Sequence, residues 1–241
     1  MTPDECVRGI AGAVGQVGGE WMFDATVFAK GAELGLDPWA WYHIGRGGVL
    51  GNADPDAVVA AFGFFNPVVQ VKAWNKGLAA IEPRKASEVY AGECAAFGTR
   101  RFADVAAAGR LADLLSKALD TAAVIALPVF AGWRNLLPSY DGASGPERLA
   151  LALQTAREHR GGSHVVAVAG YGVPPLQALV SGRNGPPNAT FFGWPEPYPD
   201  PELGKEKMAA AERITNLMVA PAFEVLTDDE RAELTAGLRA L

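Results

Sequence analysis

Helix-start signals recur along this chain of 241 residues and limit the folds open to it. Asp37-Pro38 and Asp54-Pro55 each combine a helix-capping residue with a proline that suits the first turn. Thr2 and Glu5 have the spacing of a capping box, and an apolar pattern of helical period follows them. No segment alternates between apolar and polar residues over the length of a substantial strand. The sequence therefore predicts a mainly α protein.

The expected helices of the first half follow from these signals and from the apolar periodicity. They cover residues 2–17, 23–34, 38–44, 57–65, 67–77, 83–97 and 102–119.

The second half is expected to contain a helix-turn-helix. A helix from Pro146 is predicted to end at His159, where a turn at 160–162 leads to a short helix over 164–169. A second turn at 170–172 precedes a helix over 174–180, and helices joined by tight glycine turns are typical of the motif. Residues 184–202 are rich in proline and aromatic residues and predict a loop packed on the body of the protein.

Several segments resemble a family of two-part helical proteins from actinobacteria that carry a helix-turn-helix domain. The strongest resemblance lies at Arg157-Glu158-His159-Arg160-Gly161-Gly162-Ser163-His164-Val165. Further similar segments are 46–51, 58–62, 65–67, 193–194 and 211–216. Where the family has a histidine before an aromatic pair, this chain has Gly18-Gly19. The resemblance implies a helical N-terminal domain over 1–122 and a C-terminal domain over 123–241 derived from a winged helix, with the Pro-rich loop 184–202 in place of the wing.

Charge and composition argue against several classes of function. With a formal net charge of −6, the chain lacks the positive charge whose attraction to phosphates dominates DNA affinity. Gln177 is the one long polar side chain of the helix that would read bases, so nucleic acid is not the expected partner. Cys6 and Cys94 lack the spacing of a disulfide framework or zinc site. The N-terminus shows no signal peptide, and no apolar run reaches the roughly 18 residues of a membrane span, so we expect a cytoplasmic protein.

Titratable groups gather at Arg157, Glu158, His159, Arg160 and His164, in a chain of which only 20% is charged. Three interpretations are open. A metal site would need a third ligand with suitable spacing, which the sequence does not offer, so we expect no metal and no cofactor. In a structural role, the charges pair with neighbours and a histidine benefits from a helix C-terminus. In a small-molecule site, the arginines hold an anionic group while either histidine or the glutamate moves a proton.

A second cluster contains Tyr42, His43 and Arg46, which we regard as candidate substrate-binding residues. Tyr42 and Arg46 are four residues apart and share a helix face. We expect Arg46 to meet the segment 157–164 in one pocket between the two parts of the chain.

The leading functional hypothesis is a small-molecule enzyme or binding protein of actinobacterial specialised metabolism, such as antibiotic biosynthesis. Its chemistry would be metal-independent acid–base catalysis of a cyclisation, elimination or displacement on a polar or anionic intermediate. One alternative is a ligand-sensing helix-turn-helix transcriptional regulator. Another is a non-catalytic subunit of a heteromeric biosynthetic complex. The sequence leaves open whether the chain forms a homodimer or a heterodimer.

Overall fold

A computed structural model describes residues 1–241, and it contains helices without a single strand, so the prediction of a mainly α fold is confirmed. None of these helices combines the length and the apolar character that crossing a bilayer requires. The α-helices are α1 (Pro3–Gly15), α2 (Val17–Glu20), α3 (Ala25–Glu33), α4 (Pro38–Gly47), α5 (Pro55–Phe62), α6 (Pro67–Ala80), α7 (Pro83–Arg101), α8 (Ala108–Thr121), α9 (Pro128–Arg134), α10 (Gly145–Gly170), α11 (Pro175–Ser181), α12 (Pro186–Phe191), α13 (Lys205–Val219) and α14 (Asp228–Arg239). Short 3₁₀ helices are η1 (Trp21–Phe23), η2 (Gly48–Leu50), η3 (Leu137–Tyr140), η4 (Pro201–Gly204) and η5 (Ala220–Val225).

The helix-start signals act as the sequence predicts. The backbone N–H of Glu5 donates to the Thr2 hydroxyl, and the Thr2 N–H donates to the Glu5 carboxylate, which completes the capping box of α1. Asp37 accepts from two backbone N–H groups at the start of α4, and Asp54 accepts from one at the start of α5. Each such cap contributes about 1 kcal/mol to helix stability, which is why local sequence determines where these helices begin.

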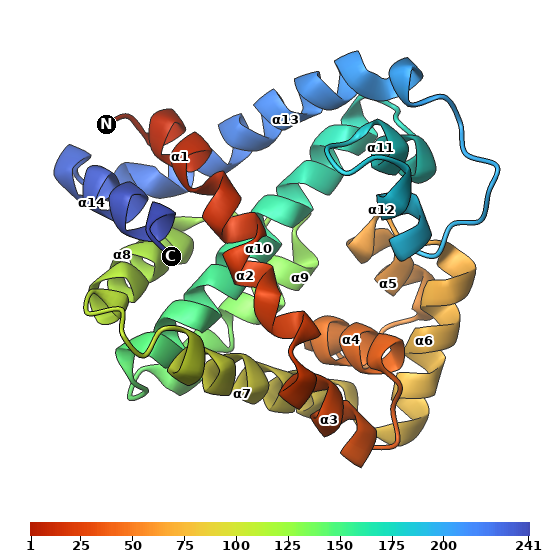
Figure 1. Ribbon diagram of the computed structural model, residues 1–241, viewed down its shortest axis with the longest axis horizontal. Coiled ribbons are helices and arrows are strands. Elements are labelled where there is room, and N and C mark those ends of the chain that lie inside the picture. Colours follow the sequence, from red (N-terminus) through yellow and green to blue (C-terminus); the bar gives the residue numbers. More distant parts are fainter.

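α10 is the central element of the fold, a helix of 26 residues that packs against α7, α8, α9 and α13 (Figure 1). The predicted turn at 160–162 is therefore wrong, because the helix passes through both glycines without interruption. A Cβ atom on Gly162 would lie 2.9 Å from Leu127 Cδ2, so this glycine permits close packing instead of ending the helix. Ser163, predicted as a cap, donates its hydroxyl to the His159 carbonyl within the helix.

The turn predicted at 170–172 is confirmed, because Tyr171 and Gly172 form a turn after α10 in which Gly172 has a positive φ of 62°. α11 follows, so α10, this turn and α11 have the helix-turn-helix order that the sequence predicts. In the Pro-rich segment, the prediction of an uninterrupted loop is wrong over α12. Its two prolines stand in the first turn, where the missing N–H would have no partner in any case.

The rest of the Pro-rich segment packs on the body, as predicted. The indole N–H of Trp194 donates to the Phe64 carbonyl at 2.8 Å, and the ring of Phe192 lies 4.4 Å from that of Phe65. Figure 1 shows α12 beside α5 and α6, and the chain continuing from there to α13.

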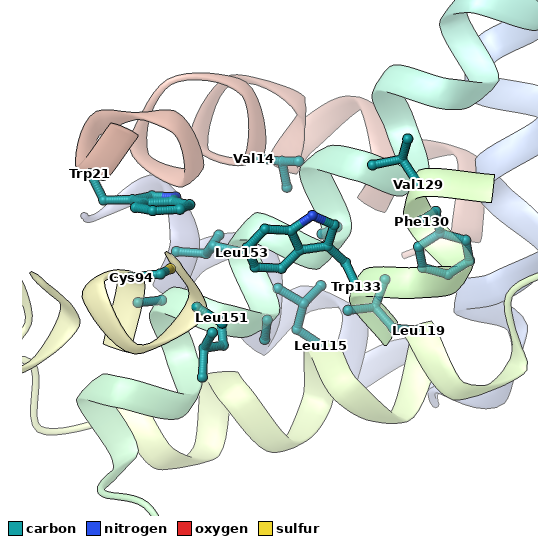
Figure 2. Close-up of a cluster of buried hydrophobic side chains, with 14 of the residues drawn as sticks. Val14, Trp21, Cys94, Leu115, Leu119, Val129, Phe130, Trp133, Leu151 and Leu153 are labelled. Carbon is teal, nitrogen blue, oxygen red and sulfur yellow. The ribbon is translucent and has the colours of Figure 1, made fainter. Parts of the chain in front are cut away.

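One hydrophobic core of 48 buried residues extends from α1 to α14. It includes residues from both sides of position 122, so the two parts expected from the sequence share this core. Figure 2 shows a portion in which α8, α9 and α10 meet the N-terminal helices, with the labelled side chains Val14, Trp21, Cys94, Leu115, Leu119, Val129, Phe130, Trp133, Leu151 and Leu153. α14 closes the fold by packing against α1, which brings the two chain ends to the same side of the molecule (Figure 1).

The continuity of α10 predicts how its glycines respond to substitution. Gly161→Ala should stabilise the protein by up to about 1 kcal/mol, because alanine is the better helix former and no atom lies within 4 Å of the added Cβ. Gly162→Ala should increase the free energy of unfolding by less, because the added Cβ would lie too close to Leu127. Urea denaturation of both variants measures the difference. A turn at this place would instead make Gly161→Ala neutral or destabilising.

Candidate functional site

A cavity of about 750 Å³ lies between α4, α5, α10, α13 and the loop that joins α8 to α9. Most of its wall is apolar, and this volume is in the range of small-molecule sites. The charged and polar side chains on the wall are Tyr42, Arg46, Arg157, Glu158, Arg160, His164 and Glu212.

A buried ion pair joins α4 to α10 on the wall of the cavity. Arg46 Nε lies 2.7 Å from Glu158 Oε1, and Arg46 Nη2 lies 2.8 Å from Glu158 Oε2. The third nitrogen of the guanidinium, Nη1, donates to the hydroxyl of Tyr42 at 3.0 Å. The amide of Gln154 donates to the same Glu158 carboxylate at 2.8 Å, and the guanidinium carbon lies 4.2 Å from the ring centre of Phe62. Both charges are therefore held in one fixed geometry.

The ion pair stays charged at neutral pH. Burial would raise the pKa of Glu158, but the charge and hydrogen bonds of Arg46 outweigh burial and hold this pKa below its ordinary value. Burial would likewise lower the pKa of Arg46, and the charge of Glu158 keeps it raised. A carboxylate so tightly held does not exchange protons near neutral pH. The geometry therefore indicates that Glu158 positions Arg46. It does not favour the proton transfer by Glu158 that the sequence suggested.

Arg157 lies beside this pair and has no hydrogen-bond partner. Its Nη1 lies 3.6 Å from Glu158 Oε1, beyond hydrogen-bond length, and its side chain is 29% exposed. A Cβ on Gly19 would lie only 3.2 Å from Arg157 Nε, so the glycine leaves room for the guanidinium. Two guanidinium groups thus face one carboxylate, and this end of the cavity carries one uncompensated positive charge.

The other polar end of the cavity lies where α10 meets α13. Arg160 forms an ion pair with Glu212 and donates to Asn216 Oδ1 at 3.2 Å. His164 Nδ1 lies 3.0 Å from the hydroxyl oxygen of Thr215 and 3.7 Å from Glu212 Oε2. Burial lowers the pKa of His164, and although Glu212 opposes this shift, the net direction keeps the imidazole neutral at pH 7.

The structure does not bring the other two histidines into the cavity wall. The ring of His159 is buried with its centre 4.6 Å from that of Phe130, and that of His43 is buried against Phe62. His43 Nδ1 donates to the carbonyl of Trp39 at 2.8 Å. Burial lowers the pKa of each of these histidines to about 4. The expectation that His159 borders the cavity is thus wrong, because five residues of continuous helix rotate a side chain by about 140°.

Sequence reasoning missed Thr215, Glu212 and Gln154. Thr215 and Glu212 lie in the segment 211–216 that resembles the family, and their spacing of three residues on α13 places them on one helix face. That pattern could have suggested a polar face, but not that the face would meet His164. No group of three or more His, Cys, Asp and Glu side chains has the arrangement of a metal site.

The sequence profile of the helix-turn-helix family matches residues 7–197, which is most of the chain. No curated protein and no solved structure matches the chain significantly.

The ion pair predicts a large loss of stability when one partner is removed. Arg46→Ala should reduce the free energy of unfolding by about 3–5 kcal/mol, because it leaves the Glu158 carboxylate buried and unpaired. The double variant Arg46→Met/Glu158→Leu should lose much less, since both charges then disappear together. Chemical denaturation measures both. Arg157→Ala is the matched control, and a loss as large as that of Arg46→Ala would contradict the assignment of the pair.

The buried histidines predict a loss of stability in mild acid. Between pH 6.5 and 4, His43 and His159 bind protons in the unfolded chain but stay neutral in the folded protein. Their contribution is therefore fully present above pH 6.5 and falls as the pH drops toward 4, by up to about 1.4 kcal/mol per pH unit for each histidine. Urea denaturation across this range should show a shallower pH dependence for His159→Leu than for the parent protein. An unchanged slope would mean that His159 titrates normally in the folded state.

Proposed function

The chain belongs to the helix-turn-helix family, and we propose that it binds a small, mostly apolar molecule with an anionic group and carries out metal-independent acid–base chemistry on it. The observation that carries the proposal is the guanidinium of Arg157, which has no hydrogen-bond partner, on the wall of a mostly apolar cavity of about 750 Å³. This guanidinium is partly buried and has no hydrogen-bond acceptor in the protein, and an anionic ligand would supply one.

The ion pair of Arg46 and Glu158 supports this assignment because it engages the carboxylate that Arg157 approaches without forming a hydrogen bond. Glu158 already receives two hydrogen bonds from Arg46 and one from Gln154. The N–H groups of Arg157 are therefore free for a carboxylate or phosphate oxygen, which a guanidinium binds in a bidentate manner. Apolar walls formed by Phe62, Phe64 and their neighbours would hold the remainder of the ligand.

The acid–base part of the proposal depends on His164. It is the one histidine on the cavity wall, and its lowered pKa leaves it neutral and able to accept a proton. A cyclisation, elimination or displacement of the kind used in specialised metabolism needs such a group close to the ligand. The assignment to actinobacterial antibiotic biosynthesis follows from the family resemblance alone and is part of the hypothesis.

The second candidate is a ligand-sensing transcriptional regulator, which the family match favours. The contacts of α11 argue against direct recognition of DNA bases by this helix. The side-chain amide of Gln177 donates to Ser181 Oγ and to the Asp200 carbonyl, so it is already engaged within the protein. α12 and η4 pack against α11, and the net charge is −6. A gel-shift experiment at low and physiological salt distinguishes the two candidates, since a specific complex at physiological salt would favour the regulator.

The proposed site predicts selective binding of acids. A panel of medium-chain alkanoic and aryl-alkanoic acids should bind more tightly than the corresponding primary amides, by isothermal titration calorimetry. Arg157→Gln should remove this preference and weaken acid binding by roughly 10- to 100-fold, as expected for a lost charge-assisted contact of about 1.5–3 kcal/mol.

Two glycine variants provide a matched control for the cavity itself. Gly161 lies on the cavity wall with no atom within 4 Å of an added Cβ, so Gly161→Phe should fill the space and abolish binding. Gly142 is equally unobstructed, is exposed in the turn before α10 and does not line the cavity, so Gly142→Phe should bind like the parent protein. If both variants bind normally, or if no acid in the panel binds, the proposed site is wrong.

A further inference from the structure

His164 presents its two ring nitrogens to different surroundings. Its ring forms part of the cavity wall, and its side chain is 25% exposed. Nδ1 faces α13, where the hydroxyl of Thr215 lies 3.0 Å away. Nε2 has no hydrogen-bond partner within the protein. The chemistry of His164 therefore depends on which nitrogen carries the single proton of the neutral ring.

The hydrogen bonds of Thr215 determine that choice. Thr215 is fully buried on α13, and its hydroxyl oxygen lies 2.8 Å from the carbonyl oxygen of Ala211, one turn earlier. A carbonyl oxygen only accepts, so the one hydroxyl proton must lie between these two oxygens, which would otherwise repel each other. The Thr215 oxygen thus offers only a lone pair to His164. Nδ1 must then carry the ring proton, which leaves a lone pair on Nε2.

The charged groups near His164 fit this arrangement. Glu212 Oε2 lies 3.7 Å from Nδ1 and would stabilise the imidazolium that forms when Nε2 accepts a proton. Arg160 holds Glu212 in place and neutralises its charge before that step. The ring of Phe64, whose centre lies 6.0 Å from that of His164, is the aromatic neighbour on the α5 side. Nδ1 thus faces Thr215 and Glu212, which orient the ring as a second residue orients a catalytic base.

We propose that Thr215 is a positioning residue that fixes His164 as an Nε2 proton acceptor in the cavity. This inference rests on the proposed function and specifies its substrate. The ligand would present an acidic C–H, N–H or O–H group to Nε2. That bond breaks, the proton moves to Nε2, and the electron pair stays on the ligand, where it forms the new bond of a cyclisation or expels a leaving group.

The positions of His164 and Arg157 on α10 set the length of that substrate. The two residues are seven positions apart on one continuous helix, which separates their Cα atoms by about 10 Å along the axis. Seven residues correspond to nearly two full turns, so both side chains lie on the same side of α10. The substrate class is therefore an elongated, mostly apolar monoanion whose reacting hydrogen lies well away from its anionic group.

The tautomer can be measured without any substrate. Long-range ¹H–¹⁵N correlation spectra of the uniformly labelled protein report which nitrogen of each histidine ring carries a proton. The chain has three histidines, so His43→Gln, His159→Gln and His164→Gln assign the signals. Above pH 7 we expect His164 to be protonated at Nδ1 and bare at Nε2. Thr215→Ser should preserve this pattern, whereas Thr215→Val, which has no lone pair to offer, should lose the preference for Nδ1.

Chemical modification gives a second readout on the intact protein. Diethyl pyrocarbonate transfers an ethoxycarbonyl group to the lone pair of an accessible neutral imidazole. Peptide mass mapping should find His164 modified well before the buried His43 and His159. Thr215→Val should slow that modification more than Thr215→Ser does.

The two proposals fail in different ways. A His164 ring protonated at Nε2 in the parent protein, or a tautomer unaffected by Thr215→Val, would overturn the assignment of Thr215 and of the base. The calorimetric acid panel would still test the ligand site on its own. Absence of acid binding together with the expected Nδ1 tautomer would instead overturn the proposed function and leave the hydrogen-bond geometry of His164 intact.

Discussion

The ion pair between Arg46 and Glu158 connects the N-terminal helices to α10, and the shape of the cavity depends on it. Burying two opposite charges is costly, and the cost is offset only when every donor and acceptor finds a partner. Here the hydroxyl of Tyr42 accepts a further hydrogen bond from Arg46, and the amide of Gln154 donates one to Glu158. The pair fixes α4 against α10 at the wall of the cavity. Because Arg46 and Gln154 already donate to Glu158, the neighbouring Arg157 lies 3.6 Å from this carboxylate without a hydrogen bond.

Because α10 is continuous, it carries both polar ends of the cavity, the one at Arg157 and the one at His164. Arg157 and Glu158 lie near its middle, and His164 follows nearly two turns later on the same side. A break at 160–162 would have separated these ends onto two helices with an adjustable angle. One rigid helix instead holds the cation and the imidazole at a constant separation, which is the kind of preorganisation that positions a ligand for proton transfer. Gly161 and Gly162 contribute by keeping this stretch free of side chains, the first toward the cavity and the second toward Leu127.

Local sequence predicts the parts of this structure that local interactions determine. The helix starts at Thr2, Asp37 and Asp54 follow directly from side chains that cap their own backbone. The same reasoning failed at Gly161 and Gly162, because tertiary packing against Leu127 outweighs the poor helix propensity of glycine. That single error misplaced His159, since histidines five apart meet across a turn but diverge on a helix. The clustering of Arg46 with the segment 157–164 was expected from the sequence, and their positions around one cavity agree. The partner of His164 could not be found in this way, because α13 lies some fifty residues further along the chain and nothing in its sequence specifies the contact.

In the function proposed above, the helix-turn-helix of this chain serves as packing architecture. A recognition helix must project polar side chains away from its own domain, whereas α11 buries Ala178, Leu179 and Val180 and engages Gln177 internally. The Pro-rich segment then packs α12 and η4 against α11. A family match therefore describes how these helices are connected, and the chemistry depends on which side chains the connection brings together. In this chain it brings together the guanidinium of Arg157, a neutral imidazole and a mostly apolar cavity, and on that combination we base the proposal of an organic anion as the ligand.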